Sequence, residues 1–471
     1  MDNEYRSRIT TPEKALSAVR SGGHVYAHNG CAQPEILMQA LVARAPELRD
    51  VEILHMGLFG YADYVLPRYE GVFRHRSLFM GGNVRQAAQE CRADYTPVFL
   101  SEIEDLIRSG ALPIDVALLQ CAPPDRHGYL SLGTSVDVTH AVVDRARHII
   151  VEINDRMPRT YGDTALHVSR VHAFTEASHP LVEYRNTEIS ETHRAIARRV
   201  AGLIPDGAVL QTGIGALPEA VLGLLGGHKD LGIHSELVPD AAVDLIEAGV
   251  INGARRNIHR GRVTAGFALG SKKLFDFIDG NPVFEFQRTA YANDPFVIAK
   301  NDRMVAINSA LEVDLTGQVC SDSIGHLPYS GIGGQVDFIR GAARSNGGIP
   351  IITLPSTARG GEVSRIVPAL RPGAGVVTSR GDVHWVITEH GAADLHGKCF
   401  RERVEAMIGI ADPKFREDLE RYAIDHKLVP KLIPVRARPS GRFSDSHGRL
   451  RSGRPAARRY QSDGTNLISG Q

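Results

Sequence analysis

Residues 207–225 have the sequence GAVLQTGIGALPEAVLGLL, an apolar run followed by a turn with two glycines and a helical pattern. The run Ala208–Gln211 is typical of a buried strand, and Pro218 is typical of the first turn of a helix. A strand that enters a helix through a glycine turn is the unit of which parallel α/β sheets are built. This stretch therefore predicts an open α/β fold.

A similar pattern lies 184 residues earlier, in GHVYAHNGCAQPEILMQAL, residues 23–41. Six residues of this earlier stretch are identical to the later one at that offset: Gly23, Val25, Ala32, Pro34, Glu35 and Leu41. Further on, Ile53-Leu54-His55 resembles Gly232-Ile233-His234. So short a match can arise by chance. A true repeat predicts two similar halves, with a ligand between them or at the carboxyl ends of their strands.

Buried β-rich runs alternate with helical patterns along the chain, which favours parallel sheets with crossover helices. Besides Ala208–Gln211, we expect strands at His24–Ala27, Val51–His55, Asp115–Leu119, His148–Ile153, Gly232–Ser235, Met304–Asn308, Ile349–Thr353 and His384–Thr388. We expect helices at Pro34–Arg44 and Leu217–Leu225. The expected domains are 1–188 and 189–434. Residues 435–471, rich in Arg, Ser, Gly and Pro, are expected to form a disordered tail.

The bulk composition is that of a soluble globular protein without a strong field of one sign. The 471 residues include 54 Lys and Arg against 54 Asp and Glu, which gives no general attraction to nucleic acid or to an anionic membrane. The five cysteines are far apart and odd in number, as expected for reduced thiols. The N-terminus lacks an apolar signal segment, and no uncharged apolar stretch is long enough to cross a bilayer. We expect a cytoplasmic protein.

Glu236 is the first candidate for chemistry. It follows the apolar run Gly232–Ser235 and precedes a helical stretch that Pro239 is expected to open, so it lies where open α/β sheets place reacting groups. A carboxylate at this place can equally have a structural role, in which it interacts favourably with the dipole at the N-terminus of the helix. The corresponding residue of the first half is Gly57, however, so the turn itself does not need a carboxylate.

Two glycine turns are the other candidates. Gly213 and Gly215 lie between a strand and a helix, where backbone N–H groups can approach a ligand. Gly331, Gly333 and Gly334 suit a loop whose N–H groups point at developing negative charge. A tight turn and a flexible loop are the simpler alternatives. His24 and His28, about 13 Å apart on a strand, are too distant to share a metal, and we expect no metal site.

Together these segments resemble the acetyl-CoA hydrolase/transferase family, the class I CoA-transferases with a glutamate nucleophile. Within it the chain is most similar to the 4-hydroxybutyrate CoA-transferases. The resemblance extends from about Pro12 to Ala423. Its specific blocks are FRHRSLFMGGNVRQA, DVALLQCAPPDRHGYLSLG, MPRTYGD, LQTGIGALPEAV, LGIHSEL, NDPFVIAKND, SALEVDLTGQV, SGIGGQVDFIRGA, LPSTARGGEVSRIVP and VITEHGAADLHGK.

The resemblance implies two CoA-transferase-like α/β domains and a role for each candidate. Glu236 would be the nucleophile, and Asn293 and Gly334 would stabilise oxyanions. The residues expected to bind coenzyme A are Gln211, Thr212, Gly213, Ile214, Gly215, Gly333, Gly334 and Arg359. Arg359 stands where relatives have a lysine near the coenzyme.

The resemblance further implies exchange of CoA between an acyl-CoA, such as acetyl-CoA, and a small acid such as 4-hydroxybutyrate or butyrate. The intermediate would be a glutamyl-CoA thioester. CoA or acyl-CoA would be a substrate, with no tightly bound cofactor, and the relatives suggest a homodimer. The alternatives are an acyl-CoA hydrolase of the same fold and a non-catalytic sensor of acyl-CoA or sugar phosphate.

Overall fold

A computed structural model describes residues 5–57, 59–184 and 188–430. Contacts between residues group Met1–Val429 as one compact unit. The expected disordered tail, residues 435–471, lies outside the described residues.

The first half of the chain forms a seven-stranded sheet in which every pair of neighbouring strands is parallel. In spatial order, its strands are β4 (Ala93–Tyr95), β3 (Phe73–Phe79), β2 (Val51–Gly57), β1 (His24–Ala27), β5 (Val116–Cys121), β7 (His148–Asn154) and β9 (Ala173–Ala177). All six residues of β5 are buried, as expected for a central strand covered on both faces.

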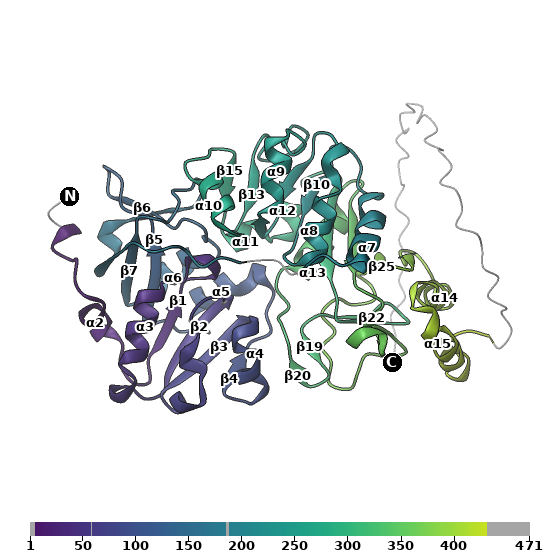
Figure 1. The fold of residues 1–471 in the computed structure, drawn as a ribbon, viewed down its shortest axis with the longest axis horizontal. Helices are drawn as coiled ribbons and strands as arrows, with labels where there is room; N and C mark the ends of the chain where they lie inside the picture. The colour runs from purple at the N-terminus through teal and green to yellow at the C-terminus, as the bar shows by residue number, and fades with distance from the viewer. Residues whose placement is uncertain (1–4, 58, 185–187, 431–471) are drawn as a thin grey trace, which may run out of the picture. The chain divides into compact units, whose positions relative to one another are not determined.

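The second half forms an eight-stranded sheet that is parallel except for its last strand. In spatial order, its strands are β15 (Phe284–Phe286), β13 (Val263–Ala265), β11 (Gly232–His234), β10 (Val209–Gln211), β16 (Met304–Ser309), β21 (Ile349–Thr353), β25 (Trp385–Thr388) and β26 (Gly391–Asp394). In Figure 1, the first sheet is coloured purple to blue-teal and the second teal to green.

Seven strands of the second sheet follow the same order as the seven of the first, which confirms the repeat; β26 is the additional strand. In each sheet the first strand in sequence lies between the second and the fifth. Val25 and Val209, identical in the repeat, have equivalent neighbours: Val25 is paired with Ile53 and Val116, and Val209 with Gly232 and Met304. The chain is therefore an α/β protein built of two similar open sheets, as predicted.

Helices connect and cover the strands. They are α2 (Pro12–Ala15), α3 (Glu35–Ala43), α4 (Gly82–Gln89), α5 (Ile103–Ser109), α6 (Thr139–Arg145), α7 (Glu191–Ala201), α8 (Ala216–Leu222), α9 (Ala241–Glu247), α10 (Lys272–Ile278), α11 (Thr289–Ala292), α12 (Pro295–Ile298), α13 (Gln335–Arg344), α14 (Phe400–Ile410) and α15 (Pro413–Asp425). No helix among the described residues is both long enough and apolar enough to cross a bilayer.

Short strands pair outside the main sheets. They are β6 (Tyr129–Ser131) with β8 (Ala165–His167), β12 (Leu237–Pro239) with β14 (Phe267–Leu269), β17 (Glu312–Asp314) with β18 (Val319–Cys320) and β24 (Ile366–Val367), β19 (Ser323–Ile324) with β20 (Leu327–Pro328), and β22 (Thr357–Ala358) with β23 (Val363–Ser364).

One hydrophobic core extends through both halves. A single cluster of buried side chains includes Tyr26 and Leu119 of the first sheet together with Leu210 and Ile233 of the second. Because the halves share this core, they do not separate into two compact units. The expected domain boundary between residues 188 and 189 stays a prediction.

All the expected strands form, and their ends shift by no more than two residues. The helical stretch expected after Pro239, Ala241–Ala248, forms as α9 (Ala241–Glu247), but Glu236 does not lie directly before this helix, because β12 (Leu237–Pro239) intervenes. The backbone N–H groups of Gly266 and Phe267 donate to the Glu236 carbonyl oxygen at 2.8 and 3.1 Å. These bonds begin the parallel pairing of β12 with β14 and keep the chain extended.

Candidate active site

A cavity of about 570 Å³ lies at the carboxyl ends of strands from both sheets. Gly57 ends β2 and Phe79 ends β3, while Gly213 follows β10 and Glu236 follows β11; all four line the cavity. The carboxyl edge of parallel strands is the place where open α/β sheets bind ligands. The cavity thus lies both at the carboxyl ends of the strands and between the two halves, the two places at which the repeat predicted a ligand.

Glu236 presents its carboxylate to two donors. The Nδ2 atom of Asn293 donates to Glu236 Oε2 at 3.3 Å, and the backbone N–H of Gly334 donates to the same carboxylate. A Cβ atom at position 334 would lie 2.1 Å from Glu236 Oε2 and 2.3 Å from Asn293 Nδ2. Only glycine permits this close approach of backbone to carboxylate.

The surroundings of Glu236 make its carboxyl unusually basic. Burial raises the pKa of Glu236 to about 7, while the hydrogen bonds from Asn293 and Gly334 lower it and so limit the rise. Near neutral pH the group is therefore divided between its two protonation states. A poorly hydrated carboxylate of this kind can serve as a nucleophile or as a base.

His234 holds the segment that carries Asn293. Its Nδ1 atom accepts from Arg256 Nη2 at 3.1 Å and Asn301 Nδ2 at 3.3 Å, so Nε2 carries the proton and donates to the Ala292 carbonyl oxygen at 2.9 Å. Burial, assisted by the charge of Arg256, lowers the pKa of His234 to about 3. A neutral histidine thus fixes the end of α11, immediately before Asn293.

Ser235 holds the glycine turn on the other side. Its Oγ donates to the Thr212 carbonyl oxygen at 3.0 Å and accepts from the Thr212 N–H at 3.3 Å. Gly215, at the end of the turn, has a φ of +105°, which residues other than glycine rarely adopt. The consecutive residues His234, Ser235 and Glu236 therefore have three tasks. The first holds the Asn293 segment, the second holds the glycine turn, and the third presents its carboxylate to the cavity.

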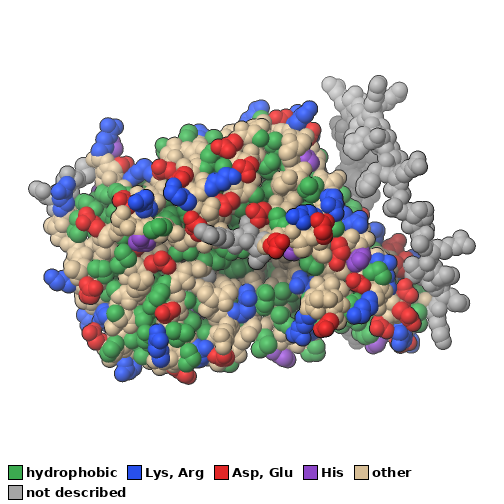
Figure 2. Space-filling view, in the orientation of Figure 1, with side chains coloured by type: hydrophobic (Ala, Val, Ile, Leu, Met, Phe, Trp, Pro, Cys, Tyr) green, Lys and Arg blue, Asp and Glu red, His purple; other side chains and the backbone are tan. Residues whose placement is uncertain are grey.

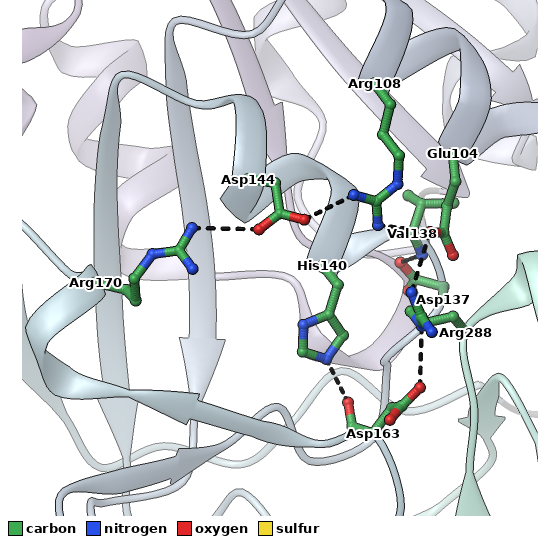
Figure 3. Close-up of polar contacts among 9 residues, drawn as sticks. All are labelled: Glu104, Arg108, Asp137, Val138, His140, Asp144, Asp163, Arg170 and Arg288. Atoms are coloured by element: carbon green, nitrogen blue, oxygen red, sulfur yellow. Dashed lines mark hydrogen bonds and ion pairs between the residues drawn. The ribbon is translucent and has the colours of Figure 1, made fainter.

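The start of α11 is bound to the first half of the chain. Arg288, which precedes the helix, pairs through Nε with Asp163 Oδ2 at 3.0 Å and lies 4.0 Å from Glu104 Oε2, as Figure 3 shows. The Thr289 N–H donates to the Asp137 carbonyl oxygen at 3.0 Å. Asn293 is consequently positioned by contacts at both ends of its helix.

Each glycine of the loop before α13 has its own structural reason. Gly334 makes room for the Glu236 carboxylate, as described above. A Cβ atom at Gly331 would lie 2.9 Å from the Phe79 ring, and Gly333 has a φ of +59°. The loop is therefore packed against Phe79 and Glu236, and the choice between an anion-binding loop and a flexible turn stays a prediction.

The structure brings most of the candidate residues together. Glu236, Asn293 and Gly334 are in direct contact, and Gly213, Ile214 and Gly333 line the same cavity. Gln211 and Thr212 are buried, and Gln211 Oε1 accepts from the Ile307 N–H at 3.0 Å. Arg359 is exposed in a short 3-10 turn, Arg359–Gly361, and is not among the residues that line the cavity. Its role stays a prediction.

Arg85 is a cavity residue that the sequence did not single out. Arg85 and Glu236 are the two charged residues among the described residues that line the cavity. The guanidinium of Arg85 lies 3.8 Å from the centre of the Tyr329 ring, and Nε donates to the Tyr329 carbonyl oxygen at 2.6 Å. The block FRHRSLFMGGNVRQA contains Arg85, but only the fold brings it to the cavity of Glu236.

Two further observations concern metal binding and surface charge. Over the described ranges, no three His, Cys, Asp or Glu side chains are grouped so as to hold a metal ion. On the face shown in Figure 2, basic and acidic side chains are interspersed, without a large patch of one sign.

Comparison with protein families matches two parts of the chain. Residues 1–184 match the acetyl-CoA hydrolase/transferase N-terminal domain, and residues 270–423 match the C-terminal domain of the same family. Glu236 lies between the two matched ranges, so neither family model covers it.

Full-length relatives cover nearly the whole chain. The 4-hydroxybutyrate coenzyme A transferase of Clostridium kluyveri is 47% identical over 88% of this chain and 97% of its own. The succinyl-CoA:acetate/propanoyl-CoA:succinate CoA transferase of Fasciola hepatica is 46% identical over 92% and 91%. Among solved structures, the 4-hydroxybutyrate CoA-transferase of Porphyromonas gingivalis has a TM-score of 0.78 and 37% identity, and covers 90% of this chain and 99% of that one.

A stability measurement tests the environment of Glu236 independently of any activity. The ordinary pKa of 4.5 and the folded value of about 7 mean that the folded state binds more protons than the unfolded state between these pH values. The free energy of unfolding therefore falls as pH rises through this window. We expect Glu236→Gln to be more stable than the wild type at pH 8, by at most about 3 kcal/mol, and equal to it near pH 4.

Denaturant unfolding at the two pH values measures this difference. Glu188→Gln, which changes an exposed glutamate, is the control and should show no such dependence. A Glu236→Gln protein no more stable than wild type at pH 8 would contradict the unfavourable burial of this carboxylate.

Proposed function

This chain belongs to the acetyl-CoA hydrolase/transferase family and is a CoA-transferase, and we propose that it moves CoA between an acyl-CoA and a small carboxylic acid through a glutamyl-CoA thioester on Glu236. The observation that carries this proposal is the contact of one half-buried carboxylate with two donors, Asn293 Nδ2 and the Gly334 N–H.

The first step is attack of a Glu236 carboxylate oxygen on the thioester carbonyl carbon of the acyl-CoA. A C–O bond forms, the C–S bond breaks, and CoA leaves as the thiolate, so that an acyl-glutamyl anhydride remains. Burial favours this step because a poorly hydrated carboxylate has less water to lose before attack. The same burial requires that the group first be deprotonated, since its pKa is about 7.

The second step is attack of the CoA thiolate on the Glu236 side-chain carbonyl carbon. The first acid leaves as its carboxylate, and Glu236 becomes a thioester. Negative charge then develops on the remaining glutamyl oxygen. If Oε1 carries the acyl group, that oxygen is Oε2, to which Asn293 already donates, and the Gly334 N–H donates to the same carboxylate. Loss of one such donor typically costs about 3 kcal/mol of barrier.

The acceptor acid completes the cycle by reversing these steps. Its carboxylate attacks the glutamyl thioester, CoA leaves and then attacks the new anhydride, and Glu236 is regenerated. One thioester replaces another, so the exchange is nearly thermoneutral. Binding of the long CoA body, remote from the reacting carbonyl, can align the thioester with Glu236.

The substrates proposed here are acetyl-CoA or another acyl-CoA and an acid such as 4-hydroxybutyrate or butyrate. The similarity to 4-hydroxybutyrate CoA-transferases supports this choice. Arg85, the cation of the cavity lining, suits anionic substrates. The cytoplasmic location, the homodimer and the absence of a tightly bound cofactor stay predictions.

Replacement of Glu236 tests the nucleophile. We expect Glu236→Ala to abolish CoA exchange and Glu236→Asp to come close to doing so, because the shorter side chain withdraws the oxygen from the reacting carbon. Circular dichroism should show both proteins folded. Borohydride, which reduces a thioester, should inactivate the wild type only after acyl-CoA is added. Full activity in Glu236→Ala, or equal inactivation without acyl-CoA, would sink the assignment.

Kinetics with a panel of acids separates transfer from hydrolysis. A transferase should show ping-pong kinetics in acyl-CoA and acid, with release of free CoA at least 10-fold slower than exchange. We expect 4-hydroxybutyrate and butyrate to be accepted with acetyl-CoA as donor. Turnover of acetyl-CoA that does not depend on any acid would instead identify a hydrolase.

A further inference from the structure

Asp337 is a buried carboxyl close to the active site to which no role has yet been given. It lies in the first turn of α13, three residues after Gly334, and only 4% of its surface is exposed. Its Oδ1 atom accepts from Ser101 Oγ at 2.9 Å, and its Oδ2 atom accepts from the Ser101 N–H at 3.1 Å. Both oxygens of one carboxyl thus bind a single residue from the other half of the chain.

The residue before Ser101 binds the glycine loop directly. The Leu100 N–H donates to the Gly333 carbonyl oxygen at 3.1 Å. That carbonyl and the Gly334 N–H belong to the same planar, trans peptide unit, in which they point in opposite directions. Fixing the Gly333 oxygen on Leu100 therefore fixes the direction of the N–H that donates to Glu236.

A glycine loop does not provide this orientation by itself. The Gly333–Gly334 peptide joins two residues without side chains, so rotation about its flanking bonds meets little steric resistance. The adjacent pair Leu100 and Ser101 holds it from outside, since Leu100 binds Gly333 and Ser101 binds Asp337. The two attachment points lie on either side of Gly334.

We propose that Asp337 is a positioning residue for CoA transfer: its clamp on Ser101 keeps Leu100 against Gly333, and so keeps the Gly334 N–H directed at the Glu236 carboxylate. This inference rests on the proposed function and deepens it. It assigns to the first half of the chain the orientation of one of the two donors that stabilise the glutamyl oxyanion.

Asp337 also affects Glu236 through its charge. Burial, together with the negative charges of Glu236 and Glu102, raises the pKa of Asp337 to about 7, although the hydrogen bonds from Ser101 lower it. Arg340, one turn along α13, pairs with Asp382 at 3.1 Å, and its positive charge also attracts the negative charge of Asp337. Because the Asp337 and Glu236 carboxylates repel each other, removing the charge of Asp337 makes ionisation of Glu236 easier.

Three variants separate orientation from charge. Asp337→Ala removes the clamp and the charge. Ser101→Ala removes one hydrogen bond of the clamp and keeps the charge. Asp337→Asn removes the charge, but its amide can accept from the Ser101 N–H and donate to Ser101 Oγ. The controls are Ser109→Ala, whose hydroxyl binds only the Leu106 carbonyl oxygen within α5, and Asp105→Asn, an exposed carboxylate of the same helix.

The measurement is the single-turnover rate of borohydride-trapped glutamyl-CoA, with kcat and KM at steady state and the pH profile of kcat/KM. We expect Asp337→Ala to lower kcat about 10- to 100-fold and Ser101→Ala about 3- to 10-fold, below the loss expected for a missing donor. The KM for acyl-CoA should change less than threefold. Asp337→Asn should recover most of the kcat, with the acidic limb of the profile moved to lower pH.

Several outcomes would overturn the clamp. One is Asp337→Ala and Ser101→Ala proteins that melt at lower temperature but trap glutamyl-CoA as fast as the wild type. Another is Asp337→Asn as slow as Asp337→Ala at every pH. If Asp337→Ala does not fold, Ser101→Ala and Asp337→Asn still decide the matter. Failure to trap glutamyl-CoA in the wild type would refute the proposed function itself, which is a different result.

Discussion

The contact among the Glu236 carboxylate, Asn293 Nδ2 and the Gly334 N–H is the constraint around which the rest of the structure is arranged. A carboxylate that is partly removed from water needs donors, and here it has two. Burial leaves it basic enough to react, while the donors keep it from being permanently protonated. Since both donors lie on loops, the surrounding structure must hold these loops rigidly.

That rigidity comes from hydrogen bonds and ion pairs, each of which joins segments from two different parts of the fold. His234 and Ser235, next to Glu236 in sequence, hold the Asn293 segment and the Thr212 turn. The first half of the chain holds α11 through Asp163 and Asp137, and it holds the glycine loop through Leu100. The site is thus carried by the second half and aligned by the first.

The repeat explains how one fold can divide these tasks. Both sheets have the same strand order, so both offer carboxyl strand ends at the cavity. Gly57 lines the cavity at the place that corresponds to Glu236, where it adds no second charge. A second carboxylate there would raise the pKa of Glu236 further and would require its own donors. Similar backbones therefore carry different chemistry.

The sequence by itself determined the α/β class, the repeat, the central strands and the position of Glu236 at a strand end. These features depend on local hydrophobic pattern and on glycine and proline, which act within a few residues. Only the tertiary structure decided that β12 follows Glu236, that Arg85 lines its cavity while Arg359 does not, and that Asp337 binds Ser101. Each of these depends on pairing or contact between segments distant in sequence, which no local pattern encodes.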